Sequence, residues 1–257
     1  MDPGTIIGII SAVIMLAGSI IIAEGALYGF VDVPALIIIA GGTFCGVLIA
    51  FPMRDVLRLP VLFRKVLFSR PKEAAPVIDQ IVSLAETARH DGILALESRL
   101  DTVSEPFLAS ALRLVVDGLP PDTVEAVLRR DMKSTHLRHT AGRRLFSQLG
   151  RTAPMFGLMS TLMGLVMMLA DMNPLTVGRH MSIALLGTFY GTVLANLLFL
   201  PAAEKLNGYN ANELEIMELI MAGIRGIQCG DNPSMIRRNL STFLPQKQRA
   251  ELDGTEE

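Results

Sequence analysis

Hydroxyl side chains are the polar groups that two long apolar stretches of this sequence offer for chemistry. They include Ser160 and Thr161 in the stretch 152–170, and Ser182, Thr188 and Thr192 in the stretch 181–203. Hydroxyl oxygens can coordinate a passing cation, but they do not hold a transferred proton as a carboxylate does. An ion route along these stretches would therefore need a carboxylate from a second polypeptide.

Small residues recur at helical spacing beside these hydroxyls. Gly157 and Gly164 lie on one side of the first stretch, and Gly187 and Gly191 repeat every four residues in the second. Such spacing lets two membrane helices approach closely. The residues alone leave two interpretations open, since the hydroxyls could contact an ion or could serve, with the glycines, only helix association.

Two prolines accompany these stretches. Pro154 and Pro201 are expected at the same cytoplasmic depth of two antiparallel helices. Each proline removes a hydrogen-bond donor and so frees a backbone carbonyl. Paired weak points of this kind predict a place where the helices move.

The elements that must position these residues are membrane helices. Of the 257 residues, 51% are hydrophobic and 19% are charged, and the mean hydropathy is +0.45. These three values are typical of membrane proteins. Four uncharged stretches are long enough to cross a hydrocarbon core of about 30 Å, namely 5–23, 33–51, 152–170 and 181–203.

The sequence therefore predicts an all-α integral membrane protein with four transmembrane helices and a helical cytoplasmic domain between spans 2 and 3. The predicted segments are 1–53 for the first two spans, 54–151 for the cytoplasmic domain, 152–203 for the last two spans and 204–257 for a helical tail. The intervals 54–151 and 204–257 are densely charged, which is why they are expected in water.

The distribution of basic residues predicts the orientation. Six of them follow the second span, namely Arg54, Arg58, Arg64, Lys65, Arg70 and Lys72, whereas the turn "EGALYGFVD" has two acids and no base. Cytoplasmic loops carry the excess of Lys and Arg. We therefore expect both termini in the cytoplasm and the loop 171–180 outside. No basic region precedes the first stretch, so it is interpreted as a span rather than as a cleaved signal peptide.

The cytoplasmic interval is predicted to be helical, with Ser104 capping a helix that ends near Gly118. Arg89 and Glu97 stand eight residues apart and would share one face if Gly92 did not break the helix. Spacing alone favours two ordinary surface charges.

Several functional classes find no support. His136 and His139 have a metal-compatible spacing, but no Cys or carboxylate completes a site, so no metal is expected. The sequence has no nucleotide-binding loop, nucleophile motif or zinc signature, so neither an enzyme nor a cofactor is predicted. Its 23 basic and 25 acidic residues give no reason to expect nucleic-acid binding. Cys45 and Cys229 are expected to stay unpaired.

The residues resemble the MotA and PomA family, the larger stator subunits of the bacterial flagellar motor, within the MotA/TolQ/ExbB group. Ordered motifs along nearly the whole chain carry this resemblance: "MDPGTIIGI", "DVPALIIIAGGTF", "ARHDGILALE", "LVVDG", "APMFGLMSTLMGLVMML", "ALLGTFYGTVLANLLFLPAAEKL" and "GIQCGDNPSMIRRNLSTFLP".

The resemblance implies a ring of five A subunits in the bacterial inner membrane around a dimer of a MotB/PomB-like B subunit. The single membrane helix of that B subunit carries the ion-binding Asp, and its outer domain grips peptidoglycan. The third and fourth spans would line the B helices, and Pro154 and Pro201 take the positions of the family's functional prolines. Arg89 and Glu97 take those of the charges that engage the rotor switch protein FliG.

The transported ion is expected to be Na⁺ or H⁺. Thr161 and Thr188 occupy positions where sodium-driven relatives carry threonines, so the resemblance mildly favours Na⁺. Two other functions stay open, namely a non-flagellar energiser of the TolQ/ExbB type and a membrane scaffold without ion flux. The four predicted spans and the tail motif favour the flagellar stator over the three-span TolQ and ExbB proteins.

Overall fold

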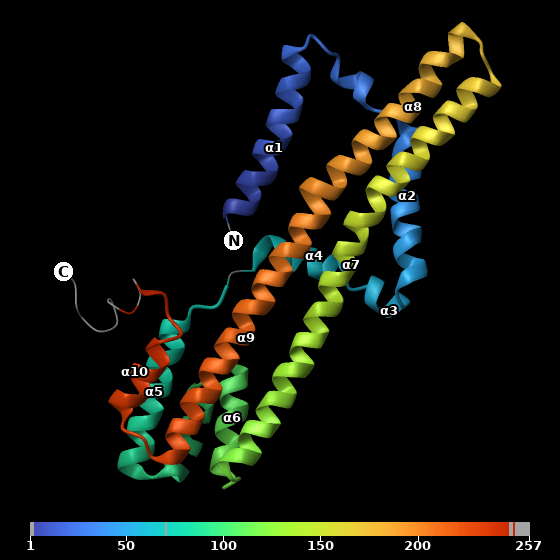
Figure 1. Ribbon diagram of the computed structural model, residues 1–257. Coiled ribbons are helices and arrows are strands. Elements are labelled where there is room, and N and C mark those ends of the chain that lie inside the picture. Colours follow the sequence, from blue (N-terminus) through green and yellow to red (C-terminus); the bar gives the residue numbers. More distant parts are fainter. Residues whose placement is uncertain (1–2, 70, 247–248, 250–257) are drawn as a thin grey trace. The chain divides into compact units, whose positions relative to one another are not determined.

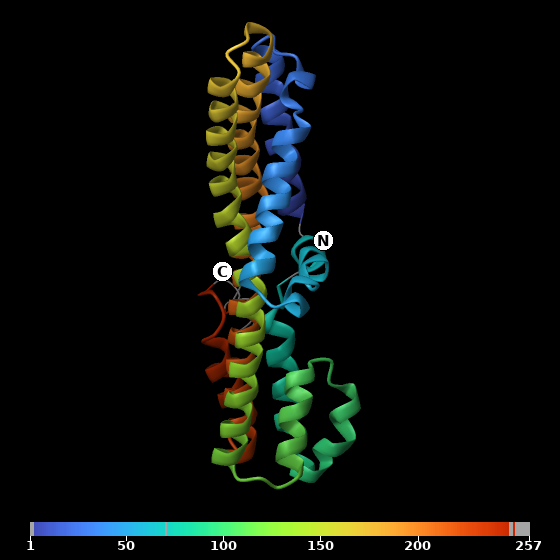
Figure 2. The same ribbon diagram turned by 90° about the vertical axis from the view of Figure 1, so that its right-hand side faces the viewer.

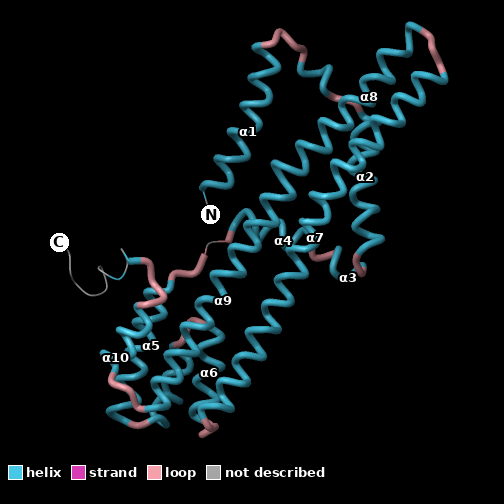
Figure 3. Tube along the Cα trace, viewed as in Figure 1, coloured by secondary structure: helices cyan, strands magenta, loops and turns pink. Residues whose placement is uncertain are grey.

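The chain folds as helices joined by short loops (Figures 1 and 3). A computed structural model describes residues 3–69, 71–246 and 249. Within these residues no strand occurs, which confirms the predicted all-α class. Contacts divide the chain into two compact units: unit 1 comprises residues from 1–70 and 139–208, and unit 2 comprises residues from 71–138 and 209–257.

Unit 1 contains the apolar helices. They are α1 (Pro3–Ile22), α2 (Val33–Ala50), the short α3 (Met53–Val56), α4 (Leu59–Phe68), the later part of α7 (Pro121–Ala170), α8 (Pro174–Val193), the π-helical segment η3 (Leu194–Phe199) and the start of α9 (Leu200–Cys229). A 3-10 turn, η1 (Leu27–Phe30), precedes α2. Helices α2 and α8 lie side by side.

Three helical stretches among the described residues are long and apolar enough to cross a membrane: Leu27–Ala50, Pro121–Ala170 and Pro174–Cys229. The apolar part of α1 is shorter, Ile6–Ile22. Helix α7 runs without interruption from the charged interval 54–151 into the third apolar stretch. The count of four spans and the boundaries of the four segments stay predictions.

The expected outward loop 171–180 is wrong in extent. Only residues 171–173 separate α7 from α8, because Asn173 accepts the N–H of Leu175 at 3.0 Å and Pro174 occupies the first position of α8. An Asn cap followed by Pro is a strong helix start. Arg179 and His180 consequently belong to the first turns of α8.

Unit 2 is a helical domain with its own core. Its elements are α5 (Ala74–Asp91), the 3-10 segment η2 (Ile93–Thr102), α6 (Pro106–Val116), the first part of α7, the rest of α9 and α10 (Pro233–Ser241). Segment η2 lies beside α6 (Figure 2), and α10 lies beside α5. Fully buried side chains fill the centre, including Ile78, Ile81, Leu108, Leu112, Leu219 and Ile220. Burial of this apolar core holds the unit together.

Charged pairs join the surface of unit 2. The Arg129 side chain donates to Glu125 on the same helix, and Arg225 of α9 contacts the other Glu125 oxygen at 3.1 Å. The hydrogen bond from Arg129 is the first cause that lowers the pKa of the Glu125 carboxyl. The predicted Ser104 cap is wrong, because Glu105 precedes α6 and no side chain caps it.

Candidate functional site

The candidate site is the seam between α7 and α8. The four glycines predicted to pack helices all lie in it: Gly157, Gly164, Gly187 and Gly191. A Cβ atom at Gly164 would lie 2.6 Å from the carbonyl oxygen of His180, and one at Gly191 would lie 2.5 Å from that of Ala153. Real Cβ atoms do not approach backbone atoms so closely. The two helices can therefore pack as closely as they do only because these positions are glycines.

The side chains of Thr161 and Thr188 meet across the seam. Their hydroxyl oxygens contact each other, and both also lie 3.2 Å from the carbonyl oxygen of Gly157. The Thr161 hydroxyl lies 3.0 Å from a further carbonyl oxygen, that of Ala184. Four oxygen atoms thus gather within hydrogen-bonding reach, although only two hydroxyl hydrogens are available among them.

This oxygen cluster has the chemistry of a site for a hard cation. Hydroxyl and carbonyl oxygens are ligands that such cations take, and membrane transporters use backbone carbonyls for Na⁺. Thr188 is exposed and Thr161 is half-buried, so the cluster is open on the side of α8. No group of three His, Cys, Asp or Glu side chains that could hold a metal occurs in the part of the chain that the structure describes.

The other two predicted lining residues lie differently. Ser160 is 0% exposed and donates across the seam to the carbonyl oxygen of Ile183 at 3.0 Å. Thr192 is exposed and donates to Thr188 O of its own helix at 2.8 Å. Ser160 therefore lies inside the seam, whereas Thr192 shares the open side with Thr188. Their place on an ion path stays a prediction.

Both prolines lie within helices of unit 1, and one of them is close to an irregular segment. Pro154 is inside α7, next to the Ala153 carbonyl that faces Gly191. Pro201 is the second residue of α9 and stands two positions after the end of η3, the only π-helical segment in the described residues. A π-helix widens the hydrogen-bond ring to i→i+5, and such segments are frequent at functional sites. The sequence analysis missed η3, for which Pro201 was the one available signal.

Arg89 and Glu97 do not share a helix. Helix α5 ends at Asp91, because Gly92 has a φ of +85°, and Glu97 belongs to the 3-10 segment η2. Because Gly92 breaks the helix between them, Arg89 and Glu97 do not share one helix face as they would on a continuous helix. Both side chains are exposed, and among the described residues neither forms an ion pair. Their charges remain available to a partner.

A further contact that the sequence analysis missed fastens the start of α2 to α8. The Tyr190 hydroxyl accepts the N–H of Asp32 at 2.9 Å and donates to the carbonyl oxygen of Phe30. The Asp32 carboxylate also accepts the Ala35 N–H at 2.9 Å as the cap of α2. A tyrosine within an uncharged span was the available signal, because a buried phenol usually finds a hydrogen-bond partner.

Thr43 is an unexplained polar side chain in α2. It is 2% exposed on the same face as Ile39 and Val47, and no group of the described residues forms a hydrogen bond with its hydroxyl. Thr43→Val keeps the shape and removes this hydroxyl, so the free energy of unfolding should stay equal or rise by about 1 kcal/mol. Unfolding of the detergent-solubilised protein measures it.

Thr152→Val provides the matched control, because the Thr152 hydroxyl donates to Gln148 O at 2.8 Å. This control should lose stability or stay neutral. A clear loss of stability in Thr43→Val, larger than in the control, would show that the Thr43 hydroxyl has a partner such as a buried water.

Comparison with known proteins points to one family. Residues 99–219 match the model of the MotA/TolQ/ExbB proton channel family. The chain is 36% identical to chemotaxis protein PomA of Vibrio alginolyticus over 97% of this chain and 98% of that protein. Motility protein A of Cereibacter sphaeroides gives the same three values. In the structure of the flagellar MotAB stator complex from Bacillus subtilis, one chain superposes with a TM-score of 0.91 at 29% identity, covering 98% and 99% of the two chains.

Proposed function

Because the chain belongs to the MotA/TolQ/ExbB proton channel family, we propose that it is the A-type stator subunit of a bacterial flagellar motor. The observation that carries this proposal is the extent of the similarity. Chemotaxis protein PomA of Vibrio alginolyticus, motility protein A of Cereibacter sphaeroides and a solved MotAB stator chain each match 97% or more of this chain. The resemblance found in the sequence is thereby confirmed. The family is one of ion channels, and no enzymatic activity is proposed.

The proposed partner is a B-type subunit with one membrane helix. It supplies the ion-binding carboxylate, because the described spans offer oxygens at Thr161 and Thr188 but no acid within the seam. Relatives of known structure are MotAB complexes, which supports such a partner. Large apolar side chains stay exposed on α7, among them Met155, Leu158, Leu162 and Val166. A face of this kind needs lipid, the B helix or further copies to cover it.

We further propose that five copies surround a B dimer in the inner membrane, with both termini in the cytoplasm. Na⁺ is favoured over H⁺ as the coupling ion, on the strength of the oxygen cluster around Thr161. An ion that falls through 100 mV releases about 2.3 kcal/mol, several times the thermal energy. Binding and release at the B-subunit carboxylate would step the ring, and unit 2 would pass the torque to FliG.

The testing experiment is complementation. The chain, expressed together with a one-span subunit of the MotB/PomB type, should restore swimming to cells that lack their own stator. Swimming speed should then collapse when potassium replaces sodium in the medium. Swimming that persists without sodium would overturn the sodium assignment alone, whereas failure to swim with a correctly inserted complex would overturn the stator function.

Charge reversal at Arg89 or Glu97 tests the rotor contact. Arg89→Glu and Glu97→Lys should each lower swimming speed several-fold, since an exposed charge without a partner in its own chain is replaced by its opposite. Stability should change by less than about 0.5 kcal/mol. Arg130→Glu is the control, because Arg130 is also exposed in unit 2. Normal swimming of both variants would remove the assigned role.

Double replacement of Pro154 and Pro201 by alanine tests the prediction that the helices move at these two prolines, which would then act as a hinge. The alanine N–H groups restore two helix donors, so the protein should be as stable or more stable while swimming slows or stops. Pro174→Ala is the control, because Pro174 stands at the first position of α8, where a helix does not use the N–H. A double variant that swims like its parent contradicts the hinge.

A further inference from the structure

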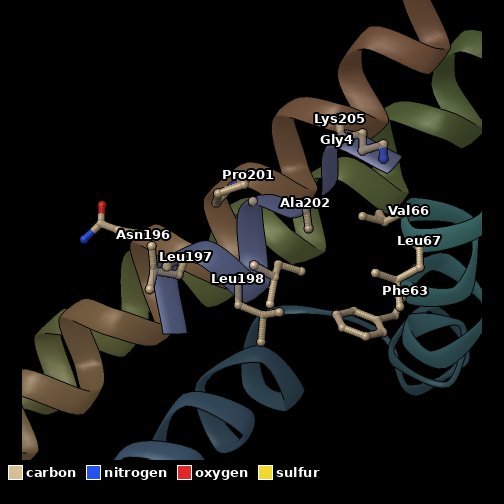
Figure 4. Close-up of a pocket in the computed structure, with 13 residues that line it drawn as sticks. Gly4, Phe63, Val66, Leu67, Asn196, Leu197, Leu198, Pro201, Ala202 and Lys205 are labelled. Carbon is tan, nitrogen blue, oxygen red and sulfur yellow. The ribbon is translucent and has the colours of Figure 1, made fainter. Parts of the chain in front are cut away.

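A half-open apolar cavity of about 350 Å³ lies within unit 1 and is lined by residues of α1, of α4 and of the junction of η3 with α9 (Figure 4). Its volume is in the range of about 300–1,000 Å³ that ligand sites occupy. Gly4, Gly8 and Ala12 line it from α1, and Phe63 and Leu67 line it from α4. The cavity is distinct from the seam of α7 and α8.

Small residues on α1 make the room. Gly4, Gly8 and Ala12 follow one another every four residues, a spacing that in membranes usually brings two helices into contact. Here the spacing faces the cavity instead, and a Cβ atom at Gly8 would meet nothing within 4 Å. Apolar walls without facing atoms lose dispersion contacts, and an apolar cavity does not hold water well. An apolar chain would restore the lost contacts.

Positive charge surrounds the same cavity. Lys205 of α9 lines it directly, and α4 carries Arg64 and Lys65 next to its lining residues. The sequence from 56 to 72 contains no acidic residue. No carboxylate of the described residues lies within ion-pair distance of Arg64 or Lys65.

The apolar lining of the cavity and the basic residues beside it together favour one kind of occupant. Basic side chains beside a pocket between membrane helices favour anionic lipid headgroups, and an amphipathic basic helix such as α4 favours the membrane surface. We propose that the cavity takes one acyl chain of an anionic phospholipid, with the phosphate held by the basic side chains of α4. The inference rests on the proposed function only for the membrane location of unit 1.

The bound acyl chain would also contact the irregular part of the fourth span. Leu197 of η3 and Pro201 line the cavity, so a bound acyl chain packs against the place where that helix departs from α-helical geometry. Lipid occupancy would thereby favour one conformation of the Pro201 region.

The test uses the complete complex of the chain and its partner subunit, reconstituted in phosphatidylcholine vesicles. Traces of spin-labelled phosphatidylglycerol or spin-labelled phosphatidylcholine are added, and electron paramagnetic resonance measures the fraction of label that the protein immobilises. Phosphatidylglycerol should be preferred by at least about five-fold at this site, which is the factor expected for a single basic contact. Equal immobilisation of both lipids would overturn the proposal.

Three variants locate the site. Gly8→Phe fills the cavity and should abolish the preference, whereas Gly18→Phe should retain it, because Gly18 also has open space around it but does not line the cavity. Arg64→Gln combined with Lys65→Gln should clearly lower the preference, with Lys205 still lining the cavity, while immobilised phosphatidylcholine stays unchanged. A preference that survives Gly8→Phe, or is lost equally in Gly18→Phe, would overturn the cavity as its cause.

The readout separates this inference from the proposed function. Lipid immobilisation is measured without ion flow or swimming, so a chain that fails to drive a motor can still show the preference. Conversely, a chain that swims but shows no preference would refute the lipid site alone. Circular dichroism and the elution volume of the complex establish that Gly8→Phe folds and assembles.

Discussion

Gly191→Val is expected to destabilise the protein by about 3 kcal/mol or more and to abolish swimming. The added Cβ would lie 2.5 Å from the Ala153 carbonyl oxygen, and the next contacts are also backbone, the Ala153 carbonyl carbon and the Gly157 Cα. Backbone cannot rotate away as a side chain can, so α7 and α8 would have to separate. Overpacking of well-packed cores costs about 1–3 kcal/mol, and a contact with rigid backbone belongs at the upper end or above.

Gly178→Val is the matched control for this variant. Gly178 lies in the same helix, and a Cβ atom there would meet nothing within 4 Å. Both variants carry the same change in intrinsic helix propensity. Denaturant unfolding in detergent should therefore separate them by several kcal/mol. Equal stability of the two variants would show that the seam opens at little cost.

Loss of both hydroxyls at Thr161 and Thr188 is the second change with a large expected effect. In the double valine variant, ion-driven swimming should stop, or fall at least about ten-fold, because removing preorganised polar ligands from a buried path commonly costs several kcal/mol. Valine has nearly the shape of threonine, so the helices should still pack. Swimming speed, sodium uptake by vesicles and thermal stability are measured on the same preparations.

The matched control is the double serine variant, which keeps both hydroxyl oxygens and loses only the methyl groups. It should retain most of the speed. A scaffold without ion flux predicts the reverse, namely that the valine variant swims normally. If the double serine variant is as impaired as the double valine variant, the loss of swimming is caused by altered packing and not by the loss of the hydroxyl oxygens.

Much of the fold follows from where charges are absent. A helix satisfies all the backbone hydrogen bonds of a stretch that crosses hydrocarbon, which is why all four uncharged stretches were predicted to be helices. Helix ends were less well predicted. Asn173 and Pro174 start α8 earlier than its charged residues suggested, and Gly92 ends α5 between Arg89 and Glu97. In each case a local backbone signal outweighed the pattern of charge.

The candidate site was predictable in part, because periodicity identifies a face of a helix but not its neighbour. Gly157 and Gly187 were predicted to pack helices from their spacing, and they do lie in one seam. The spacing could not tell that Ser160 is buried while Thr188 is exposed, since this depends on how far α8 is rotated against α7.

The sequence by itself determined the family, the all-α membrane class and the absence of an acid beside the hydroxyls, because composition and ordered motifs are properties of the chain alone. Only the tertiary structure decided that Thr161 and Thr188, 27 residues apart, place their hydroxyl oxygens in contact. It also decided the π-helical turn before Pro201 and the cavity beside α1. These features arise from the distances between helices, which are set by packing over many residues and which no single stretch of sequence encodes.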